Sequence, residues 1–154
     1  MIYGDPFIFA FQFDVVESWN TPGDIWRNGM FSLYVEGEKL FDIVDVFELK
    51  TTFGFYSKAN IHDLNVNDLT IDAKALFKNA WDYFIGDGEV LVDGLFDLTC
   101  TPMGDNGCYL YFLKTTNGDR LVWSIDHGRK VNETILPSGT INYVINQLHR
   151  EEIK

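Results

Sequence analysis

Few side chains in this sequence have both the type and the spacing that catalysis requires. Ser124, Asp126 and His127 are the residue types of a nucleophile triad, but they are crowded together and no Gly-x-Ser-x-Gly elbow surrounds the serine. A turn explains these three residues better than catalysis does. The three histidines of the chain are widely spaced, and none lies in a zinc-binding motif. We therefore expect no catalytic residue, no zinc site and no enzyme activity.

One stretch matches the opening of a calcium-binding loop, with Asp63, Asn65 and Asn67 at alternate positions. The sixth position of such a loop needs glycine for a sharp turn, and the twelfth needs a glutamate that binds the ion through both oxygens. This chain has Asp68 and Lys74 at those positions. The sequence therefore predicts no metal site here, and we expect no cofactor.

The most unusual cluster of charges is acidic. Five carboxylates fall within a stretch that contains no lysine or arginine: Asp82, Asp87, Glu89, Asp93 and Asp97. Glycines lie among them, but the segment lacks the lysine and the hydroxyl residue of a phosphate-binding loop, and its carboxylates would repel a phosphate. Two interpretations remain open, a solvated loop and an acidic recognition surface.

The whole chain carries a formal net charge of −11, and the excess lies in its first two-thirds. Residues 1–97 contain 17 acidic and 6 basic residues, whereas residues 98–154 contain 6 of each. Such a field repels nucleic acid and anionic membranes and attracts a basic macromolecule. Acidity can also serve solubility alone. We expect no nucleic-acid and no membrane partner, and the charge favours a basic protein partner and a purely solubilising role equally.

With 154 residues and 46% apolar composition, the chain has the size of one domain with a full core. We expect a single domain over residues 1–154. The first residues carry no positively charged side chain and no apolar run approaches the length of a membrane span, so the sequence indicates neither an export signal nor a spanning helix. We therefore expect a cytoplasmic protein in which Cys100 and Cys108, which form no CxxC pair, are reduced and packed.

The strongest structural prediction is a β-hairpin around Asn117-Gly118, a pair that suits a tight turn. The first strand of this hairpin has apolar residues on both sides, with Tyr109, Tyr111 and Leu113 on one and Cys108, Leu110 and Phe112 on the other. A strand with two apolar faces is typical of the interior of a sheet, so we expect other strands to cover it.

Other segments alternate apolar and polar residues with the period of a strand. Alternate phenylalanines predict a buried face for one strand: Phe7, Phe9, Phe11 and Phe13. Residues 30–35 and 40–44 predict a second hairpin around the four-residue turn Glu36-Gly37-Glu38-Lys39. Residues 47–56 predict a further strand, and the segments 90–92, 95–100 and 131–136 predict short ones.

Two segments have helical periodicity instead. The first is Ala73–Ile85, with an expected buried stripe of Ala73, Leu76, Phe77, Ala80, Trp81, Phe84 and Ile85. The second is Thr140–His149, with the stripe Ile141, Val144, Ile145 and Leu148. Together the elements predict an α+β fold, a mainly antiparallel sheet of about six to eight strands with two helices packed against one side.

Several short motifs are spread over most of the chain: Tyr3-Gly4-Asp5-Pro6-x-x-Phe9-Ala10, Gly29-x-Phe31-x-Leu33-x-Val35-x-Gly37, Arg120-Leu121-Val122-Trp123, and Leu136-Pro137-x-Gly139 before Val144-Ile145-x-x-Leu148. Together they resemble the immunity protein 42 family of bacterial polymorphic toxin and contact-dependent growth inhibition systems. None of these motifs is catalytic. The resemblance implies a cytosolic protein that is made beside a secreted or contact-delivered toxin and that binds and neutralises it.

The functional prediction combines this resemblance with the charge. We expect a non-enzymatic inhibitor that binds a cognate toxin C-terminal domain and occludes its active or substrate-binding surface. A toxin that cleaves nucleic acid is usually basic where it holds phosphates, so the acidic excess favours a basic nuclease as the partner. The alternative is a small enzyme or ligand-binding domain with an aromatic pocket between the sheet and the helices.

The expected toxin-binding residues lie in loops and turns, because binding residues tend to lie on loops held by a rigid scaffold. They are the acidic segment Asp82, Asp87, Glu89, Asp93 and Asp97, the second-hairpin acids Glu36, Glu38, Asp42 and Asp45, and Trp19 or Trp26 as an aromatic anchor. We expect the two acidic groups to share one face.

Overall fold

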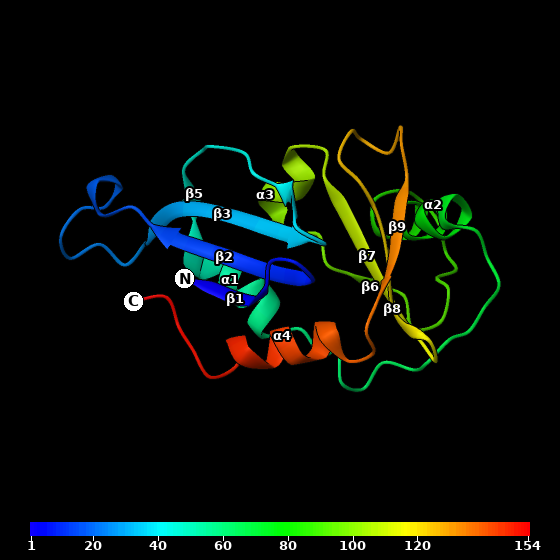
Figure 1. Ribbon diagram of the computed structural model, residues 1–154. Helices are drawn as coiled ribbons and strands as arrows, with labels where there is room; N and C mark the ends of the chain where they lie inside the picture. The colour runs from blue at the N-terminus through cyan, green and yellow to red at the C-terminus, as the bar shows by residue number, and fades with distance from the viewer. The chain divides into compact units, whose positions relative to one another are not determined.

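The computed structural model describes residues 1–154 and contains two antiparallel sheets and four α-helices (Figure 1). The predicted α+β class with antiparallel strands is confirmed. The prediction of one sheet is wrong, because the strands divide into a five-stranded and a four-stranded sheet. Contacts between Cα atoms group the chain into two compact units, residues 1–59, 100–102 and 141–154, and residues 60–99 and 103–140. Each unit contains one of the sheets, and a single domain over the whole chain stays a prediction.

The first unit contains the five-stranded sheet. Its strands run in the order β1-β2-β3-β4, and β5 also pairs with β3: β1 (Ile2–Asp5), β2 (Phe9–Val15), β3 (Asn28–Val35), β4 (Glu38–Phe41) and β5 (Phe47–Glu48). A 3-10 helix, η1 (Glu17–Trp19), follows β2. The second predicted hairpin is confirmed as β3 and β4, although β4 ends earlier than expected.

The turn of the β3–β4 hairpin is tighter than predicted. Val35 pairs with Glu38, so only Glu36 and Gly37 connect the two strands. Both residues have positive φ, 52° for Glu36 and 86° for Gly37, as the tightest hairpin turns require. The prediction of a four-residue turn is therefore wrong.

Residues 47–56 do not form the predicted strand. Only β5 pairs with β3, and the chain continues directly into helix α1 (Leu49–Ser57). Glu48 caps this helix, because its carboxylate accepts hydrogen bonds from the N–H groups of Lys50 at 3.1 Å and Thr51 at 2.7 Å. The segment alternates like a strand, but its buried residues also fit the spacing of a helix: Leu49, Thr52, Phe53 and Tyr56.

Aromatic rings pack α1 against the sheet. Between ring centroids, Tyr56 lies 4.2 Å from Phe11, and Phe53 lies 5.2 Å from Phe13. Phe13 in turn lies 5.2 Å from Phe31 on the neighbouring strand. Aromatic side chains therefore fill the space between the sheet and α1, and these contacts favour the helix over the strand.

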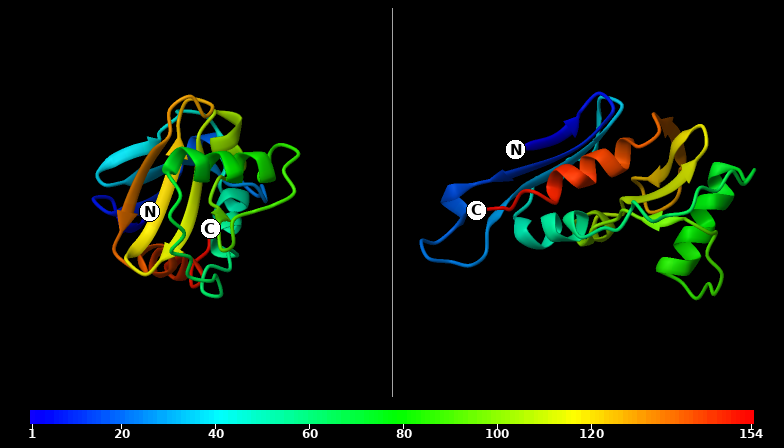
Figure 2. Two further views of the ribbon diagram at one scale, coloured as in Figure 1. Left: turned by 90° about the vertical axis from the view of Figure 1, so that its right-hand side faces the viewer. Right: turned by 90° about the horizontal axis from the view of Figure 1, so that it is seen from below.

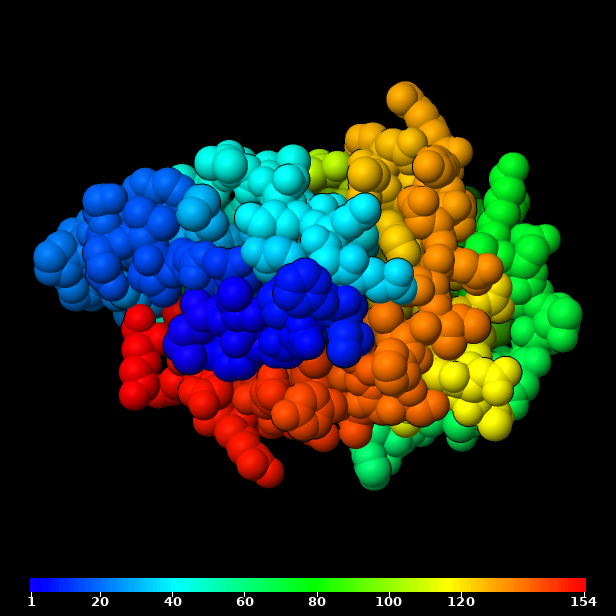
Figure 3. Space-filling view, viewed as in Figure 1, coloured from blue at the N-terminus to red at the C-terminus, as the bar shows by residue number.

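Helix α4 (Thr140–Leu148) confirms the second predicted helix, and its predicted stripe is buried. The helix runs beside β1, the edge strand of the five-stranded sheet (Figures 2 and 3). Gly4 in β1 allows this close approach, because a Cβ there would lie 2.3 Å from the Phe9 carbonyl oxygen and 2.9 Å from Val144 Cγ2.

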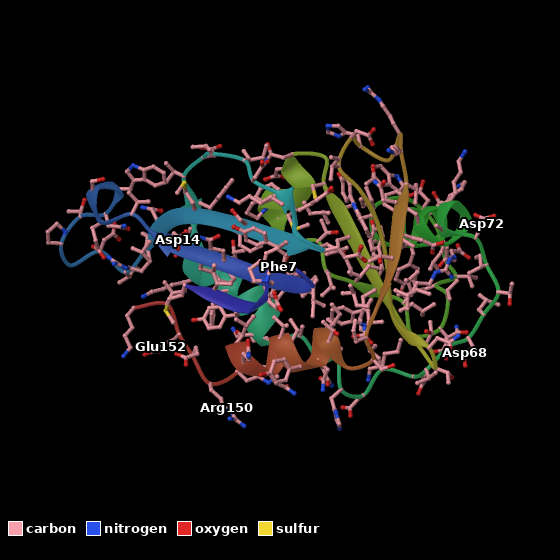
Figure 4. All side chains as sticks on the ribbon, in the orientation of Figure 1. Phe7, Asp14, Asp68, Asp72, Arg150 and Glu152 are labelled. Atoms are coloured by element: carbon pink, nitrogen blue, oxygen red, sulfur yellow. The ribbon has the colours of Figure 1, made fainter.

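Three of the four alternate phenylalanines are buried as predicted: Phe9, Phe11 and Phe13. Phe7, labelled in Figure 4, is instead 80% exposed. It belongs to the turn between β1 and β2, in which the Phe7 N–H donates to Asp5 Oδ1 at 2.9 Å and the Ile8 N–H donates to the Asp5 carbonyl at 2.9 Å. The prediction that the Phe7 ring is buried is wrong, because a turn does not continue the alternation of a strand.

The second unit contains the four-stranded sheet in the order β6-β7-β8-β9: β6 (Phe96–Asp97), β7 (Tyr109–Thr115), β8 (Gly118–Ser124) and β9 (Asn132–Leu136). The hairpin of β7 and β8 is confirmed, and β7 lies inside the sheet between β6 and β8, as its two apolar faces predicted. Its turn is shifted by one residue. Thr115 pairs with Gly118, so Thr116 and Asn117 connect the strands.

The shorter predicted strands have mixed outcomes. The segment 131–136 is confirmed as β9, whereas 95–100 contributes only β6 and 90–92 forms no strand. A short helix that the sequence pattern did not predict, α3 (Thr101–Asp105), precedes β7.

Helix α2 (Ala73–Phe84) confirms the first predicted helix and covers one face of the four-stranded sheet (Figure 2). Asp72, labelled in Figure 4, caps its start by accepting the Ala75 N–H at 2.8 Å. The residues that helix and sheet bury together include Leu76, Phe77, Ala80, Tyr111, Leu113 and Val122. The buried stripe is shorter than predicted, because Phe84 is 37% and Ile85 is 49% exposed.

Candidate functional site

The acidic segment, residues 82–97 of the second unit, starts in the last turn of α2 and ends in β6. Asn79 fixes its loop to the helix, because the Asn79 side chain donates to the Val90 carbonyl at 2.9 Å and accepts from the Val92 N–H at 2.8 Å. The Gly88 N–H donates to the Asp82 carbonyl at 2.8 Å, and a Cβ at Gly88 would lie only 2.9 Å from the Asp82 carbonyl carbon. The loop is therefore held close against α2.

Two carboxylates of the acidic segment are exposed to solvent and have no partner within the chain. Asp87 and Glu89 are exposed and make no hydrogen bond or ion pair. Asp82, in contrast, forms an ion pair with Lys78 one turn earlier on α2. Asp93 is exposed where the loop ends. Asp87 and Glu89 are thus the carboxylates of this segment that are most available to a partner.

Asp97 has different surroundings. It is half-buried in β6, where it pairs with Tyr111 of β7 and accepts the Thr99 N–H at 2.9 Å. Burial raises the pKa of Asp97 above its ordinary value, and the hydrogen bonds from Thr99 offset only part of this effect. Asp97 is therefore less accessible to a partner than the carboxylates of the loop.

The acidic segment and the helix end before it also expose large apolar side chains, which periodicity did not predict. Four of them flank the unpaired carboxylates in sequence: Tyr83, Phe84 and Ile85 before Asp87, and Val90 after Glu89. Val90 is 77% exposed, and the ring centroids of Tyr83 and Phe84 lie 5.1 Å apart. An apolar centre with a polar rim is typical of protein–protein interfaces. Periodicity assigned Phe84 and Ile85 to the core because they continue the spacing of the buried stripe.

The second-hairpin acids lie in the first unit. Glu36 and Glu38 are exposed at the β3–β4 turn. This turn is hydrogen-bonded to the β1–β2 turn, because the Glu36 N–H donates to the Ile8 carbonyl at 3.0 Å. The exposed Phe7 ring lies beside it, 3.5 Å from the position that a Cβ at Gly37 would take. The two turns therefore present an aromatic ring together with acids.

Asp42 and Asp45 lie in the connection between β4 and β5, and both are exposed. The Asp45 carboxylate accepts the Val46 N–H at 2.7 Å. The same connection exposes apolar side chains at Ile43, Val44 and Val46. As in the acidic segment, apolar side chains accompany the carboxylates.

Both candidate tryptophans lie around the loop that follows β2. Trp19 ends η1 and is 36% exposed, and Trp26 is 53% exposed. Asn20 fixes the base of this loop, because its side-chain NH2 donates to the carbonyls of Val16 at 2.9 Å and Asn28 at 3.0 Å. Its Oδ1 accepts the Asn28 N–H at 2.7 Å. The loop therefore presents its tryptophans on a fixed base.

The candidate residues are divided between the units. The acidic segment belongs to the second unit, whereas the second-hairpin acids and both tryptophans belong to the first. Each unit brings its own acids together with exposed apolar side chains. That the two acidic groups share one face stays a prediction.

The three residues considered as a nucleophile triad form a turn. Ser124 is fully buried, and its Oγ donates to Asp126 Oδ1 at 2.7 Å and accepts the Gly128 N–H at 2.9 Å. The Lys130 N–H donates to the same carboxylate at 3.0 Å. Hydrogen bonds from Lys130 and Ser124 hold the pKa of Asp126 below its ordinary value. The serine hydroxyl therefore stabilises the turn through these hydrogen bonds.

No group of three or more His, Cys, Asp or Glu side chains could hold a metal ion. Cys100 and Cys108 are buried and form no disulfide. None of the helices combines the length and the apolar character that crossing a membrane requires.

Comparison with known proteins assigns the chain to a family. A crystal structure of CdiI from Burkholderia dolosa AUO158 has the same fold, with a TM-score of 0.75, 18% sequence identity, and coverage of 96% of this chain and 97% of that one. No curated protein matches the sequence. The family model for immunity protein 42 matches residues 1–151. Because this match spans nearly the whole chain, the protein belongs to the immunity protein 42 family.

Proposed function

We propose that this immunity protein binds the C-terminal domain of a cognate toxin, a basic nuclease, and neutralises it by occluding the active or substrate-binding surface. Family membership supports a role as a toxin inhibitor. The net charge of −11 supports a basic partner, because opposite charge on the two proteins speeds their encounter. The proposed site of action is the cytoplasm.

The observation that carries this proposal is the mixed surface at the end of α2. Asp87 and Glu89 have no partner within the chain, and exposed apolar side chains flank them in sequence, Ile85 before and Val90 after. Asn79 already holds this loop in place, so little conformational entropy is lost when a partner binds it. A nuclease that holds phosphates with lysine and arginine offers the complementary charge.

Charge reversal tests this surface. We expect the triple substitution Asp87→Lys, Glu89→Lys and Asp93→Lys to slow association with the toxin domain encoded by the neighbouring open reading frame, because attraction becomes repulsion. The effect should be about tenfold or more at low salt, and protection of toxin-exposed cells should weaken. The fold should stay intact, because exposed carboxylates contribute little to stability.

A matched control reverses three exposed carboxylates outside both acidic groups, Asp63→Lys, Asp105→Lys and Glu152→Lys, with the same change in net charge. Figure 4 labels Glu152 on the C-terminal segment that follows α4. If the acidic-segment variant folds normally and protects as well as this control, the segment is a solvated surface. Cleavage of nucleic acid by the purified toxin domain, blocked by the parent protein, tests the nuclease assignment separately.

A further inference from the structure

A groove of about 660 Å³ runs along the outer face of α1 in the first unit. Exposed apolar side chains form part of its wall: Ile25, Trp26 and Phe55. The rest of the lining comes mainly from α1, whose opposite face is buried against the sheet. The groove therefore lies on a rigid element and combines an aromatic wall with a helical floor.

Gly54 lies in the floor of this groove, in the interior of α1, where glycine is unfavourable. Glycine in a helix interior costs about 1 kcal/mol relative to alanine. Its backbone φ is not positive, and a Cβ added at Gly54 would meet no atom within 4 Å. The fold therefore does not require glycine at this position. What the missing side chain provides is depth in the groove floor.

The charge of the groove is opposite to that of the protein as a whole. Lys50 and Lys58 lie one helical turn before and after Gly54, and both are exposed without an ion pair. The acid in the lining, Glu48, is turned to the start of α1, where its carboxylate accepts the N–H groups of Arg27, Lys50 and Thr51. The two ammonium groups are therefore the charges that remain available in this groove.

We propose that this groove receives an acidic segment of the cognate toxin, with a small or apolar side chain against Gly54 and carboxylates beside Lys50 and Lys58. Trp26 and Phe55 then flank the bound segment as aromatic anchors, because a few buried aromatic residues usually carry most of the affinity of an interface. This inference rests on the proposed function, and it adds a second contact of opposite charge.

A contact of opposite sign has a specific consequence for recognition. The rest of the first unit presents acids, among them Glu36 and Asp45, which repel an acidic segment. A toxin with one basic surface and one acidic segment therefore binds best in the orientation that places the acidic segment in the groove. A basic toxin without the acidic segment would still be attracted to the acids, but it would make no contact in the groove. The groove therefore helps the protein to distinguish its cognate toxin from other basic toxins.

Two substitutions at one position separate the role of Gly54 in binding from its role in folding. Gly54→Ala should raise the unfolding temperature, because it removes the helix penalty and its Cβ meets no atom. It should change the Kd for the toxin domain of the neighbouring open reading frame by less than about threefold. Gly54→Leu fills the groove, and we expect it to weaken binding by about tenfold or more with the fold retained.

The charge is tested with Lys50→Glu and Lys58→Glu together, against the control Lys74→Glu and Lys130→Glu on exposed positions of the second unit. The groove variant, Lys50→Glu with Lys58→Glu, should bind the toxin domain about tenfold or more weakly than the parent does. The control variant should lose less affinity. If Gly54→Leu and the groove variant both fold and bind the toxin as the parent does, the groove is not part of the interface, while the proposed function stands. If the parent itself does not bind the toxin, both proposals are wrong.

Discussion

The surroundings of Asp97 disfavour the charged form of its carboxyl group. Burial raises the pKa of Asp97, so the folded protein holds this proton more tightly than the unfolded chain does. Above the ordinary aspartate pKa of 3.8, the cost of the charge therefore lowers the stability of the fold. At lower pH both states hold the proton, and the cost disappears.

We expect Asp97→Asn to raise the unfolding temperature at pH 7, because the amide keeps an oxygen for the Thr99 N–H and carries no charge. The gain should shrink as the pH falls and should be absent at about pH 3. Thermal unfolding of parent and variant at both pH values provides the measurement. A variant that is less stable than the parent at pH 7 would contradict this account of Asp97.

Tyr111 is the neighbour of Asp97 on β7, and its hydroxyl is buried without a hydrogen-bond partner. A buried polar group without a partner costs about 1–3 kcal/mol. Tyr111→Phe removes the hydroxyl and keeps the ring contacts with Phe77 at 5.3 Å and Phe84 at 5.9 Å. We expect the free energy of unfolding to stay equal or to rise by up to about 2 kcal/mol in urea titrations. A clear loss would show that the hydroxyl has a stabilising contact.

At the scale of elements, α2 and its loop act as one structural piece because Asn79 joins them through two hydrogen bonds. We expect Asn79→Ala to lower the free energy of unfolding by about 1–2 kcal/mol. Amide hydrogen exchange should become faster in residues 86–92, and toxin binding should weaken because the loop must then be ordered on binding.

Asn146→Ala is the matched control, because Asn146 is exposed on α4 and its side chain makes no hydrogen bond. This variant should leave both exchange and binding unchanged. Equal exchange in the Asn79 and Asn146 variants would mean that the loop keeps its conformation without the asparagine.

The helices differ in how well their residue ranges can be predicted from the sequence. In α2 and α4 the apolar residues follow only the helical spacing, so both helices were predicted to within one residue at each end. The segment of α1 fits two periods at once, alternation over 47–56 and the helical set that includes Leu49 and Tyr56. Contacts with β2, such as the 4.2 Å separation of the Tyr56 and Phe11 rings, select the helix. These contacts join residues distant in sequence, so local periodicity does not contain them.

At the scale of the whole molecule, the acidic excess is shared by both units. The first unit contains 11 acidic and 6 basic residues, and the second contains 12 and 6. The excess lies in residues 1–97 because that range contains the N-terminal segment of each unit, whereas the later segment of each unit is balanced in charge. The attractive field for a basic partner therefore comes from both parts of the fold.

This charge predicts a salt dependence. We expect the association rate with the toxin domain to fall by roughly tenfold or more from low salt to about 0.5 M salt, because ions screen long-range attraction. The dissociation rate should change much less, because it depends mainly on contacts within the interface. Stopped-flow or surface-plasmon-resonance measurements over a salt series test this. An association rate independent of salt would remove electrostatic attraction from the proposed function.

The amino-acid sequence by itself determined the elements whose pattern has one period, the hairpin of β7 and β8 and the helices α2 and α4. Its motifs also led to the correct family, and its composition identified the acidic segment. All of these signals are local, so they are readable without knowledge of distant contacts.

Only the tertiary structure decided which side chains are free to meet a partner. Phe84 and Ile85 have the spacing of core residues, but they lie at the end of α2, and only contacts between distant segments determine how much of each is covered. The groove at Gly54 likewise depends on a contact between distant segments, because Ile25 and Trp26 line it together with α1. Burial is a property of the assembled chain, because covering a side chain requires residues far away in the sequence.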